Sequence, residues 1–363
     1  MSKTSYYYDI KNDLEAYPDA WAVFAWSGRN TGKTYSTLKY MLDTGARFVF
    51  LKRTMEDVKL ILSGSGKVGT KLSQYGADMS PFKAINRDTG ENVRAFGIYK
   101  GYLGGFWHCD EENKPVLDPV GYIVSLSSIS KVKGFDLSDC DYLIFDEFIP
   151  SPWERVDRNE GKQLLDLYIT ISRDREHKGR PPLRLICLAN PTDVNCPVFQ
   201  ELELADDAAE MSVRGEEFRL VRGCLLHAIR MGDDFQRTEE STAAVAAMAG
   251  TAWHDMTVGE GFAYDDMTMI RRISLKGYRC RAEVLYRRFA WYIYQNGDKW
   301  YICTSRGDPS DGTYNLNTDQ DARRFFFDMQ ISLRNDYIAG CVIFQTYTMF
   351  DVIINFRKFF PFV

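Results

Sequence analysis

Apolar runs of strand length alternate with segments of helical periodicity in the first half of the chain. The runs are Ala20–Trp26, Asp141–Phe148 and Leu183–Asn190, and the helical segments Thr34–Leu42 and Gln163–Arg175 follow the first and the second of them. Nearly continuous apolar strands are typical of a parallel sheet that is covered on both faces. Strands that alternate with helices indicate parallel βαβ units. We therefore predict an α/β fold with a mainly parallel sheet for this part of the chain.

The pattern changes twice further along the chain. After about Pro197 the sequence is acidic and mostly helical in its periodicity, which predicts a helical linker subdomain. Beyond about Trp253 it becomes rich in strand-like runs, which predicts a smaller α+β domain. The expected parts are residues 1–197, residues 198–252 and residues 253–363.

The clearest strand signal of the third part is a hairpin. Asn296-Gly297 stands between two aromatic runs within Arg288–Thr304, and this dipeptide is typical of a two-residue hairpin turn. The apolar runs Ala339–Thr346 and Phe350–Phe356 predict two further strands.

The segment between the first strand and its helix reads S-G-R-N-T-G-K-T and fits a phosphate-binding loop. In such a loop, backbone N–H groups and the positive end of the helix dipole converge on a phosphate. Lys33 is placed to contact the β- and γ-phosphates, and the Thr34 hydroxyl is placed to bind Mg²⁺. Ser27 replaces the usual first glycine, and Arg29 adds a charge inside the loop. The predicted nucleotide-binding residues are Ser27, Gly28, Arg29, Asn30, Thr31, Gly32, Lys33 and Thr34.

The second apolar run ends in two acids, as D-Y-L-I-F-D-E-F. A buried strand of a parallel sheet would place Asp146 at the edge where ligands of such sheets bind, so we expect it to hold Mg²⁺. Glu147 is then the expected base that polarises the attacking water. Together with the phosphate loop, this strand predicts a nucleoside triphosphatase that uses ATP and Mg²⁺.

Two more features complete the expected site. Asn190 ends the third apolar run and is positioned to sense the γ-phosphate. Arg173 and Arg175 close the helix before that run, where a basic pair either complements the helix dipole or reaches the nucleotide of a neighbouring subunit.

Composition narrows the class of protein without defining its function. The formal net charge of −5 argues against binding nucleic acid over the whole surface. No run of about 18 apolar residues occurs, so we expect no membrane span. The eight cysteines are scattered without C-x-x-C pairs, which indicates neither zinc nor a disulfide framework.

One segment is strongly basic in spite of the negative net charge. Ile270–Arg288 contains six arginines and Lys276 against the single acid Glu283. Such a segment suits the phosphate backbone of DNA or of a structural RNA, and a solvated face is the alternative.

These motifs, taken in order, resemble those of the genome-encapsidation ATPases of small short-tailed phages, which are related to the ATPase half of large terminases. The resemblance covers about residues 21–193. It rests on the loop with arginine in its third position, on F-V-F-L-K-R-T at 48–54 and on S-K-V-K-G at 130–134. The strand with the two acids and the turn L-A-N at 188–190 complete it.

The resemblance implies a homo-oligomeric ring that hydrolyses ATP and drives double-stranded DNA into a preformed capsid through a portal protein. Such a ring works in the host cell cytoplasm and transiently at the portal vertex, and a structural RNA is left open as a further partner. By the same resemblance, Lys131, Lys133 and Arg173 act across a subunit interface, and Asn190 belongs to the coupling motif. Arg173 and Arg175 fit the role of arginine finger equally well.

Large terminases carry a ribonuclease-H-like nuclease after the ATPase domain, so we expect residues 253–363 to be a related domain. Its acids Asp298, Asp328, Asp336 and Asp351 do not stand at the ends of apolar strands, whereas metal-dependent cleavage needs converging carboxylates. We therefore predict a domain that has lost its nuclease site and binds nucleic acid or the portal.

Four alternative functions were weighed. One is a terminase with an active nuclease, and another is a different DNA-dependent P-loop ATPase. The third is a small-molecule kinase, against which Glu147 counts because a water-activating base suits hydrolysis. The fourth is a nucleotide-gated scaffold, which the intact Lys33, Asp146 and Glu147 argue against.

Overall fold

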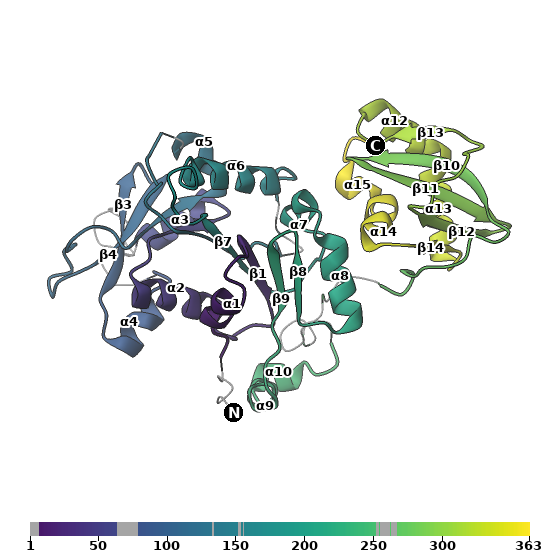
Figure 1. Ribbon diagram of the computed structural model, residues 1–363. Helices are drawn as coiled ribbons and strands as arrows, with labels where there is room; N and C mark the ends of the chain where they lie inside the picture. Colours follow the sequence, from purple (N-terminus) through teal and green to yellow (C-terminus); the bar gives the residue numbers. More distant parts are fainter. Residues whose placement is uncertain are drawn as a thin grey trace. The chain divides into compact units, whose positions relative to one another are not determined.

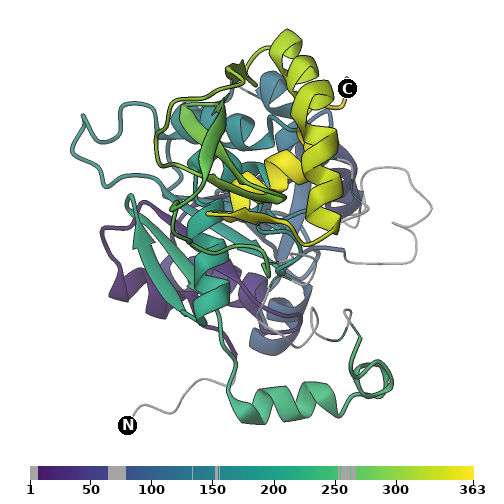
Figure 2. The ribbon, with the colours of Figure 1, turned by 90° about the vertical axis from the view of Figure 1, so that its right-hand side faces the viewer.

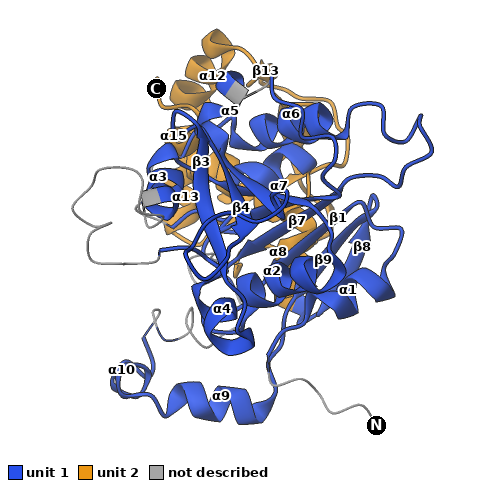
Figure 3. Ribbon diagram, turned by 90° about the vertical axis from the view of Figure 1, so that its left-hand side faces the viewer, with its two compact units in different colours: residues 1–202, 214–264 blue, residues 203–213, 265–363 orange. Residues whose placement is uncertain are grey.

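A computed structural model describes residues 7–63, 79–132, 134–151, 154, 156–251, 254, 262 and 267–363. The chain divides into two compact units (Figure 3). Unit 1 comprises residues 1–202 and 214–264, and unit 2 comprises residues 203–213 and 265–363. The run S-G-S-G-K-V-G at 63–69 predicts a flexible loop, and all of it except Ser63 lies outside the described residues.

Unit 1 is built on a nine-stranded mixed sheet with the order β3-β4-β5-β2-β6-β7-β1-β9-β8 (Figure 1). The six strands from β5 to β9 in this order pair in parallel, and the outer strands pair antiparallel. The strands are β1 (Ala22–Trp26), β2 (Phe48–Lys52), β3 (Val93–Tyr99), β4 (Leu103–His108), β5 (Gly121–Ser125), β6 (Tyr142–Asp146), β7 (Arg184–Ala189), β8 (Phe218–Val221) and β9 (Cys224–Ala228). The predicted α/β class with a mainly parallel sheet is confirmed.

Helices cover both faces of this sheet, because its central strands are buried and their side chains alternate between the faces. On one face, Val23 of β1 and Phe50 of β2 join a core with the apolar sides of α1, α2 and α4. On the other face, Phe24 of β1 packs against Phe148 and against Phe199 of α7. The helices of unit 1 are α1 (Ile10–Ala16), α2 (Lys33–Thr44), α3 (Met55–Ser63), α4 (Lys83–Thr89), η2 (Leu126–Ser128), α5 (Ile129–Val132), α6 (Glu160–Ser172), α7 (Pro197–Leu202), α9 (Asp233–Glu240) and α10 (Ala243–Ala247).

Residues 198–252 do not form the expected helical linker. Within this stretch β9 pairs in parallel with β1, the strand that precedes the phosphate loop, and β8 pairs with β9. The five residues of β9 are all buried, so this short run completes the sheet of unit 1. Helix α8 (Ala205–Arg214) falls almost wholly in unit 2, and α9 and α10 lie outside the layered core of unit 1 (Figures 1 and 2). The expected helical pattern misses β8 and β9 because each strand has at most five residues.

The segment Gly104–Pro119, which looks like an insertion in the sequence, also contributes to the sheet. Its first part belongs to β4, which joins β3 to β5 in antiparallel pairs. Gly104 and Gly105 lie where an added Cβ would meet neighbouring side chains at less than 3.0 Å, so this strand needs two glycines.

Unit 2 has a five-stranded sheet with the order β13-β10-β11-β12-β14. Strands β10, β11 and β12 form an antiparallel meander. Strand β13 pairs in parallel with β10, and β14 pairs in parallel with β12. The predicted hairpin is confirmed, with Asn296 paired to Lys299 across the turn. The elements are α8 (Ala205–Arg214), β10 (Arg279–Tyr286), β11 (Phe289–Asn296), β12 (Lys299–Cys303), β13 (Thr313–Asn315), α12 (Asp319–Phe325), η3, a π-helix (Phe326–Gln330), α13 (Ile331–Ile338), β14 (Val342–Phe344), α14 (Tyr347–Ile354) and α15 (Phe356–Phe359).

The predicted strand at 350–356 is wrong, because α14 occupies Tyr347–Ile354. Thr346 caps this helix by accepting the N–H of Met349. The helix is buried on almost every side, and such a continuous apolar run carries no period that separates a strand from a buried helix. The run at 339–346 does contain a strand, β14.

Candidate nucleotide-binding site

The predicted phosphate loop lies between β1 and α2 and borders a cavity of about 350 Å³. Gly32 precedes the helix with φ +86°, a backbone conformation that L side chains rarely adopt. Asn30 also has a positive φ, of 61°. The cavity is lined by Arg29, Asn30, Thr31, Gly32, Lys33, Thr34, Tyr35, Asp146, Glu147, Ala189 and Asn190. The fold therefore brings together the loop, both acids and the asparagine that the sequence predicts.

Topology explains why these distant segments meet. In the sheet, β7 lies between β1 and β6, and the three strands are parallel. Their carboxyl ends share one edge, which carries the phosphate loop after β1, the acids at the end of β6 and Asn190 after β7. Asn190 accordingly stands between the loop and the acids.

Lys33 is held against the loop itself. Its Nζ donates to Ser27 Oγ at 2.8 Å and to the carbonyl of Gly28 at 2.9 Å, and it lies 3.3 Å from Asn190 Oδ1. Burial lowers the pKa of Lys33 to about 7, although the charge of Asp146 acts in the opposite direction. A bound phosphate would supply the negative charge that this lysine lacks here.

Thr34 and Asp146 form the oxygen pair expected for a divalent cation. Thr34 Oγ1 donates to Asp146 Oδ1 at 2.9 Å, so a hydroxyl and a carboxylate from two elements face one small space. Mg²⁺ prefers oxygen ligands and is commonly held by one or two protein groups together with phosphate and water. The residues present therefore fit this ion.

Lys52 at the end of β2 is a site residue that sequence reasoning missed. Its Nζ donates to Asp146 Oδ2 at 2.8 Å and lies 3.5 Å from Glu147 Oε2. Burial lowers its pKa, but the two carboxylates outweigh this and raise it overall. The sequence signal that could have identified Lys52 is a charged residue at the end of an apolar strand. The pairing of β2 with β6 then brings that residue beside the two acids.

Glu147 has the geometry of a strained functional residue. Its φ is 61°, a left-handed value that is uncommon outside glycine, and its side chain is 70 % exposed at the cavity. The carboxylate is thus open to water while its backbone is constrained.

A buried arginine fixes that backbone. Arg53, next to Lys52, donates to the carbonyls of Glu147 and Phe148 at 2.9 and 3.1 Å. The same guanidinium pairs with Glu160 at 2.6 Å and with Glu154 at 3.0 Å. Such a network holds the turn after β6 by several charge-assisted hydrogen bonds, and sequence reasoning did not find it.

Hydrogen bonds within the loop and to helix α9 hold the remaining loop residues. The hydroxyls of Ser27 and Thr31 lie 2.7 Å apart in the interior. Asn30 donates to Glu239 of α9 at 3.1 Å, and Arg29 is exposed at the cavity. The stretch that the sequence suggested was a linker therefore contacts the loop.

Two of the basic residues expected at a subunit interface, Lys131 and Arg173, are exposed. Lys131 donates to the hydroxyl of Tyr102 at 2.8 Å and is exposed, whereas Lys133 lies outside the described residues. Arg173 is 41 % exposed and pairs with Asp136 at 3.2 Å.

Arg175 is a structural residue in this fold. It is 2 % exposed, donates to the carbonyl of Pro181 at 2.7 Å and also bonds the carbonyl of Cys140 and the carboxylate of Asp141. Of the two arginines, Arg173 is therefore the one whose side chain is exposed. This distinction was invisible in the sequence because the two arginines are two residues apart at the end of one helix.

A second cavity, of about 570 Å³, adjoins the first and shares Gly32 and Tyr35 with it. Tyrosines 7, 8 and 40 also line it, so four aromatic rings border the space beside the phosphate loop. Polar and charged side chains, among them Asp9 and Lys39, complete its wall.

In unit 2 three of the four acids considered for a nuclease bind other groups, and the fourth, Asp298, is exposed in the turn between β11 and β12. Asp336 accepts from the indole of Trp300 at 2.8 Å, and Asp351 is buried and paired with Lys358 at 2.7 Å. Asp328 accepts from the hydroxyl of Tyr314 at 3.2 Å. In the part of the chain that the structure describes, no group of three or more His, Cys, Asp or Glu side chains is arranged to hold a metal ion.

The parallel sheet, the loop with Lys33 and Thr34, and the acids at the end of β6 define the class of P-loop nucleotide-binding proteins. Over residues 117–350 the sequence matches the family described as podovirus DNA encapsidation protein (Gp16). The chain belongs to this family, and it is a phage DNA-packaging motor protein.

Solved structures show the same fold. A chain of the bacteriophage Phi-29 viral genome packaging motor assembly matches with a TM-score of 0.63 and 18 % identity, covering 98 % of this chain and 99 % of that chain. A chain of the Phi-28 gp11 DNA packaging motor matches with a TM-score of 0.56 and 17 % identity, covering 98 % and 97 %. No match to the sequence was found among curated proteins. Among the described residues, no helix has the length and apolar character needed to span a bilayer.

Proposed function

We propose that unit 1 binds Mg²⁺-ATP in the phosphate-loop cavity and hydrolyses it. The observation that carries this proposal is the convergence of Lys33, Thr34, Asp146, Glu147 and Asn190 on one cavity from three segments of the chain. Each has the chemistry that phosphoryl transfer to water requires.

The roles follow from the contacts. Lys33 exchanges its carbonyl partners for the β- and γ-phosphates, while Thr34 and Asp146 hold Mg²⁺. When bound between these two residues, the ion would neutralise charge on the transferred phosphoryl group. Glu147 accepts a hydrogen bond from the attacking water and holds its proton, and Asn190 contacts the γ-phosphate from between the loop and the acids.

We infer that the four tyrosines beside Gly32 receive the base of the nucleotide. The tyrosine cavity shares Gly32 and Tyr35 with the phosphate cavity, so the two cavities are neighbours beside the phosphate loop. Aromatic rings offer faces on which a purine stacks.

We further propose that ATP hydrolysis drives double-stranded DNA through a homo-oligomeric ring docked on the portal protein of a preformed capsid. Family membership supports this, as does the shared fold with motor proteins of two phages. The ring then acts in the host cytoplasm and transiently at the portal vertex. Unit 2 serves for binding rather than cleavage, since three of its four candidate acids already bind other side chains and the fourth, Asp298, is exposed in the hairpin turn.

The test separates binding from chemistry. Glu147→Gln should keep Mg²⁺-ATP binding and lose about 10²-fold or more of the turnover, because a general base is removed while the metal ligands stay. Lys33→Ala should lose ATP binding, since no other loop cation replaces the ammonium group at the phosphates. Turnover is measured by phosphate release, and binding by calorimetry.

Glu111→Gln is the matched control, because Glu111 is an exposed glutamate of unit 1 that does not line the cavity. It should behave as wild type. Loss of affinity and turnover together in Glu147→Gln, or normal turnover in Lys33→Ala, would contradict these assignments.

A further inference from the structure

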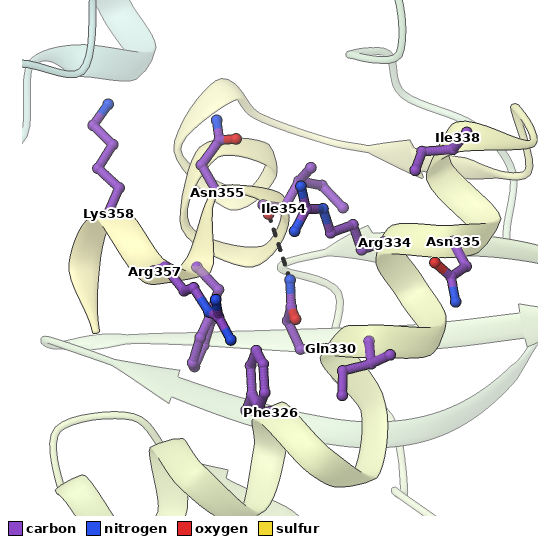
Figure 4. A pocket seen from close by; sticks show the side chains of 11 residues that line it. Phe326, Gln330, Arg334, Asn335, Ile338, Ile354, Asn355, Arg357 and Lys358 are labelled. Atoms are coloured by element: carbon purple, nitrogen blue, oxygen red, sulfur yellow. Dashed lines mark hydrogen bonds between the residues drawn. The ribbon is translucent and has the colours of Figure 1, made fainter. Parts of the chain in front are cut away.

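Unit 2 contains a groove that the nucleotide site does not use. It has a volume of about 720 Å³ and lies between α13 and the segment that joins α14 to α15 (Figure 4). Phe326 of the π-helical turn η3, Ile354 and Phe356 supply apolar walls. π-helical turns are frequent at functional sites, which is a reason to ask what this groove binds.

Aliphatic side chains stand uncovered along one wall. Ile331 is 44 % exposed and Ile338 is 76 % exposed. They are seven residues apart on α13, so they lie on the same side of the helix, two turns from each other. Two exposed isoleucines at this spacing form the kind of stripe that receives an amphipathic helix.

Two guanidinium groups border the same space. Arg334 of α13 and Arg357 of α15 point toward the groove from opposite sides (Figure 4). Lys358, by contrast, is already paired with Asp351. Within the described residues no carboxylate forms an ion pair with Arg334 or Arg357, and no acid lines the groove.

The chemistry favours a protein over a nucleic acid. Single-stranded nucleic acids bind through stacking of bases on accessible aromatic rings. Here the Arg357 guanidinium lies over Phe326, 5.5 Å from the ring centroid, and Phe356 packs 6.0 Å from the same ring. Among the residues that line the groove, the uncovered apolar groups are Ile331 and Ile338, which offer no face for a base, while the exposed ring of Phe327 lies outside this lining.

We propose that this groove is the docking site for an acidic amphipathic helix of a partner protein. Apolar residues of that helix cover Ile331 and Ile338, and its carboxylates pair with Arg334 and Arg357. Charge complementarity is the reason for this choice, because a basic or neutral helix would leave both guanidinium groups unpaired in a partly desolvated groove.

The experiment uses the full chain and a fluorescent synthetic helical peptide of about three heptads, with leucine at a and d and glutamate at the flanking positions. Comparison probes are the same peptide with lysine for glutamate, and a single-stranded oligonucleotide. Binding is followed by anisotropy. The protein variants are Arg334→Glu with Arg357→Glu, Ile338→Ser, and Arg306→Glu as a control with the same charge change at an exposed arginine of unit 2 outside the groove.

The acidic peptide should bind the wild type, the lysine peptide should not, and the double reversal should weaken binding about tenfold or more. Ile338→Ser should weaken it as well, and Arg306→Glu should change it by less than about twofold. Hydrogen exchange should show the wild-type α13 protected by the peptide. ATP turnover should be unchanged in all variants.

Equal binding of the acidic peptide by wild type and double reversal would overturn the proposal, as would absence of binding. Preferential binding of the oligonucleotide that the double reversal abolishes would identify a nucleic-acid site instead, and would also overturn it. Because the variants lie in unit 2, none of these outcomes depends on the proposed nucleotide chemistry.

Discussion

Two lysines at the site have opposite electrostatic surroundings. Lys33 contacts carbonyl and hydroxyl oxygens of the loop, and burial lowers its pKa to about 7. Lys52 contacts two carboxylates, whose charges outweigh burial and raise its pKa. The lysine of the loop is therefore partly neutral near pH 7, while the lysine beside the acids stays charged.

Proton uptake on nucleotide binding follows from the pKa of Lys33. Above pH 7 the free protein holds this lysine mostly neutral, whereas the phosphates of ATP favour its charged form. At pH 8 binding of Mg²⁺-ATP should take up close to one proton, and the affinity should fall by up to about tenfold per pH unit from pH 7 to 9. Calorimetry in buffers with different ionisation enthalpies measures the uptake.

At pH 6 the same titration is the control, because Lys33 is then already protonated and little uptake is expected. A binding enthalpy at pH 8 that does not depend on the buffer would refute this account of Lys33.

At the scale of elements, the basic segment 270–288, which contains β10, forms ion pairs through only some of its arginines. Arg281 pairs with Asp311 at 2.8 Å, and Arg288 pairs with Glu203. Both acids stand outside the segment, so two of its six arginines are paired with carboxylates that are distant in the sequence. Glu283, the acid inside it, instead accepts from the hydroxyls of Tyr292 and Thr313.

Three exposed arginines of this segment, Arg271, Arg272 and Arg279, form no ion pair within the described residues. If they contact phosphates, each releases counterions on binding, so replacing all three by alanine should lower the salt slope of DNA binding by up to about three units. Basal ATPase activity should not change. The measurement is a salt titration of double-stranded DNA binding by the full chain.

The matched control replaces Arg281 and Arg288, which already have carboxylate partners, and should leave the slope nearly unchanged. Coincident salt lines for the triple variant and the wild type would show that the basic segment is a solvated face.

At the scale of the whole molecule, the length of the sheet separates the phosphate-loop cavity from Arg173 and Arg175, which follow α6. Arg175 bonds Cys140 and Asp141, which stand just before β6, whereas Asp146 ends that strand at the phosphate site. Helix α6 returns the chain to the edge where β6 begins, and Arg173 follows its last turn. Arg173 is thus on the edge opposite its own nucleotide, so a catalytic contact requires a neighbouring subunit.

Mixing variants tests this arrangement. Arg173→Ala keeps an intact loop, and Lys33→Ala keeps an intact finger, so an assembled mixture of these two inactive proteins should recover part of the hydrolysis. A finger supplied in trans contributes about 10³-fold or more in other P-loop enzymes. The readout is phosphate release across mixing ratios, with assembly confirmed by light scattering.

A mixture of Lys33→Ala with Glu147→Gln is the control, since neither protein then supplies a working loop and base together. Equal inactivity of both mixtures would remove the trans role of Arg173.

Arg175→Ala should instead lower the free energy of unfolding by about 2–4 kcal/mol, because the substitution leaves the buried partners of Arg175 unpaired.

The sequence by itself determined the local chemistry of this protein. The loop before α2, the acids after β6 and Asn190 after β7 are recognisable because each follows a short apolar strand, and strand, turn and helix signals act over a few residues. The hairpin at Asn296-Gly297 was predictable for the same reason. The parallel sheet then follows from strands that alternate with helices.

Only the tertiary structure decided which residues meet across the sheet. Lys52 and Arg53 reach the acids because β2 neighbours β6, a pairing between segments about ninety residues apart in the chain. The burial of Arg175 and the exposure of Arg173 depend on packing around the start of β6, which no local pattern records. Strand β9 and helix α14 were missed because a short or fully buried run has no distinguishing period, and its conformation is set by the neighbours against which it packs.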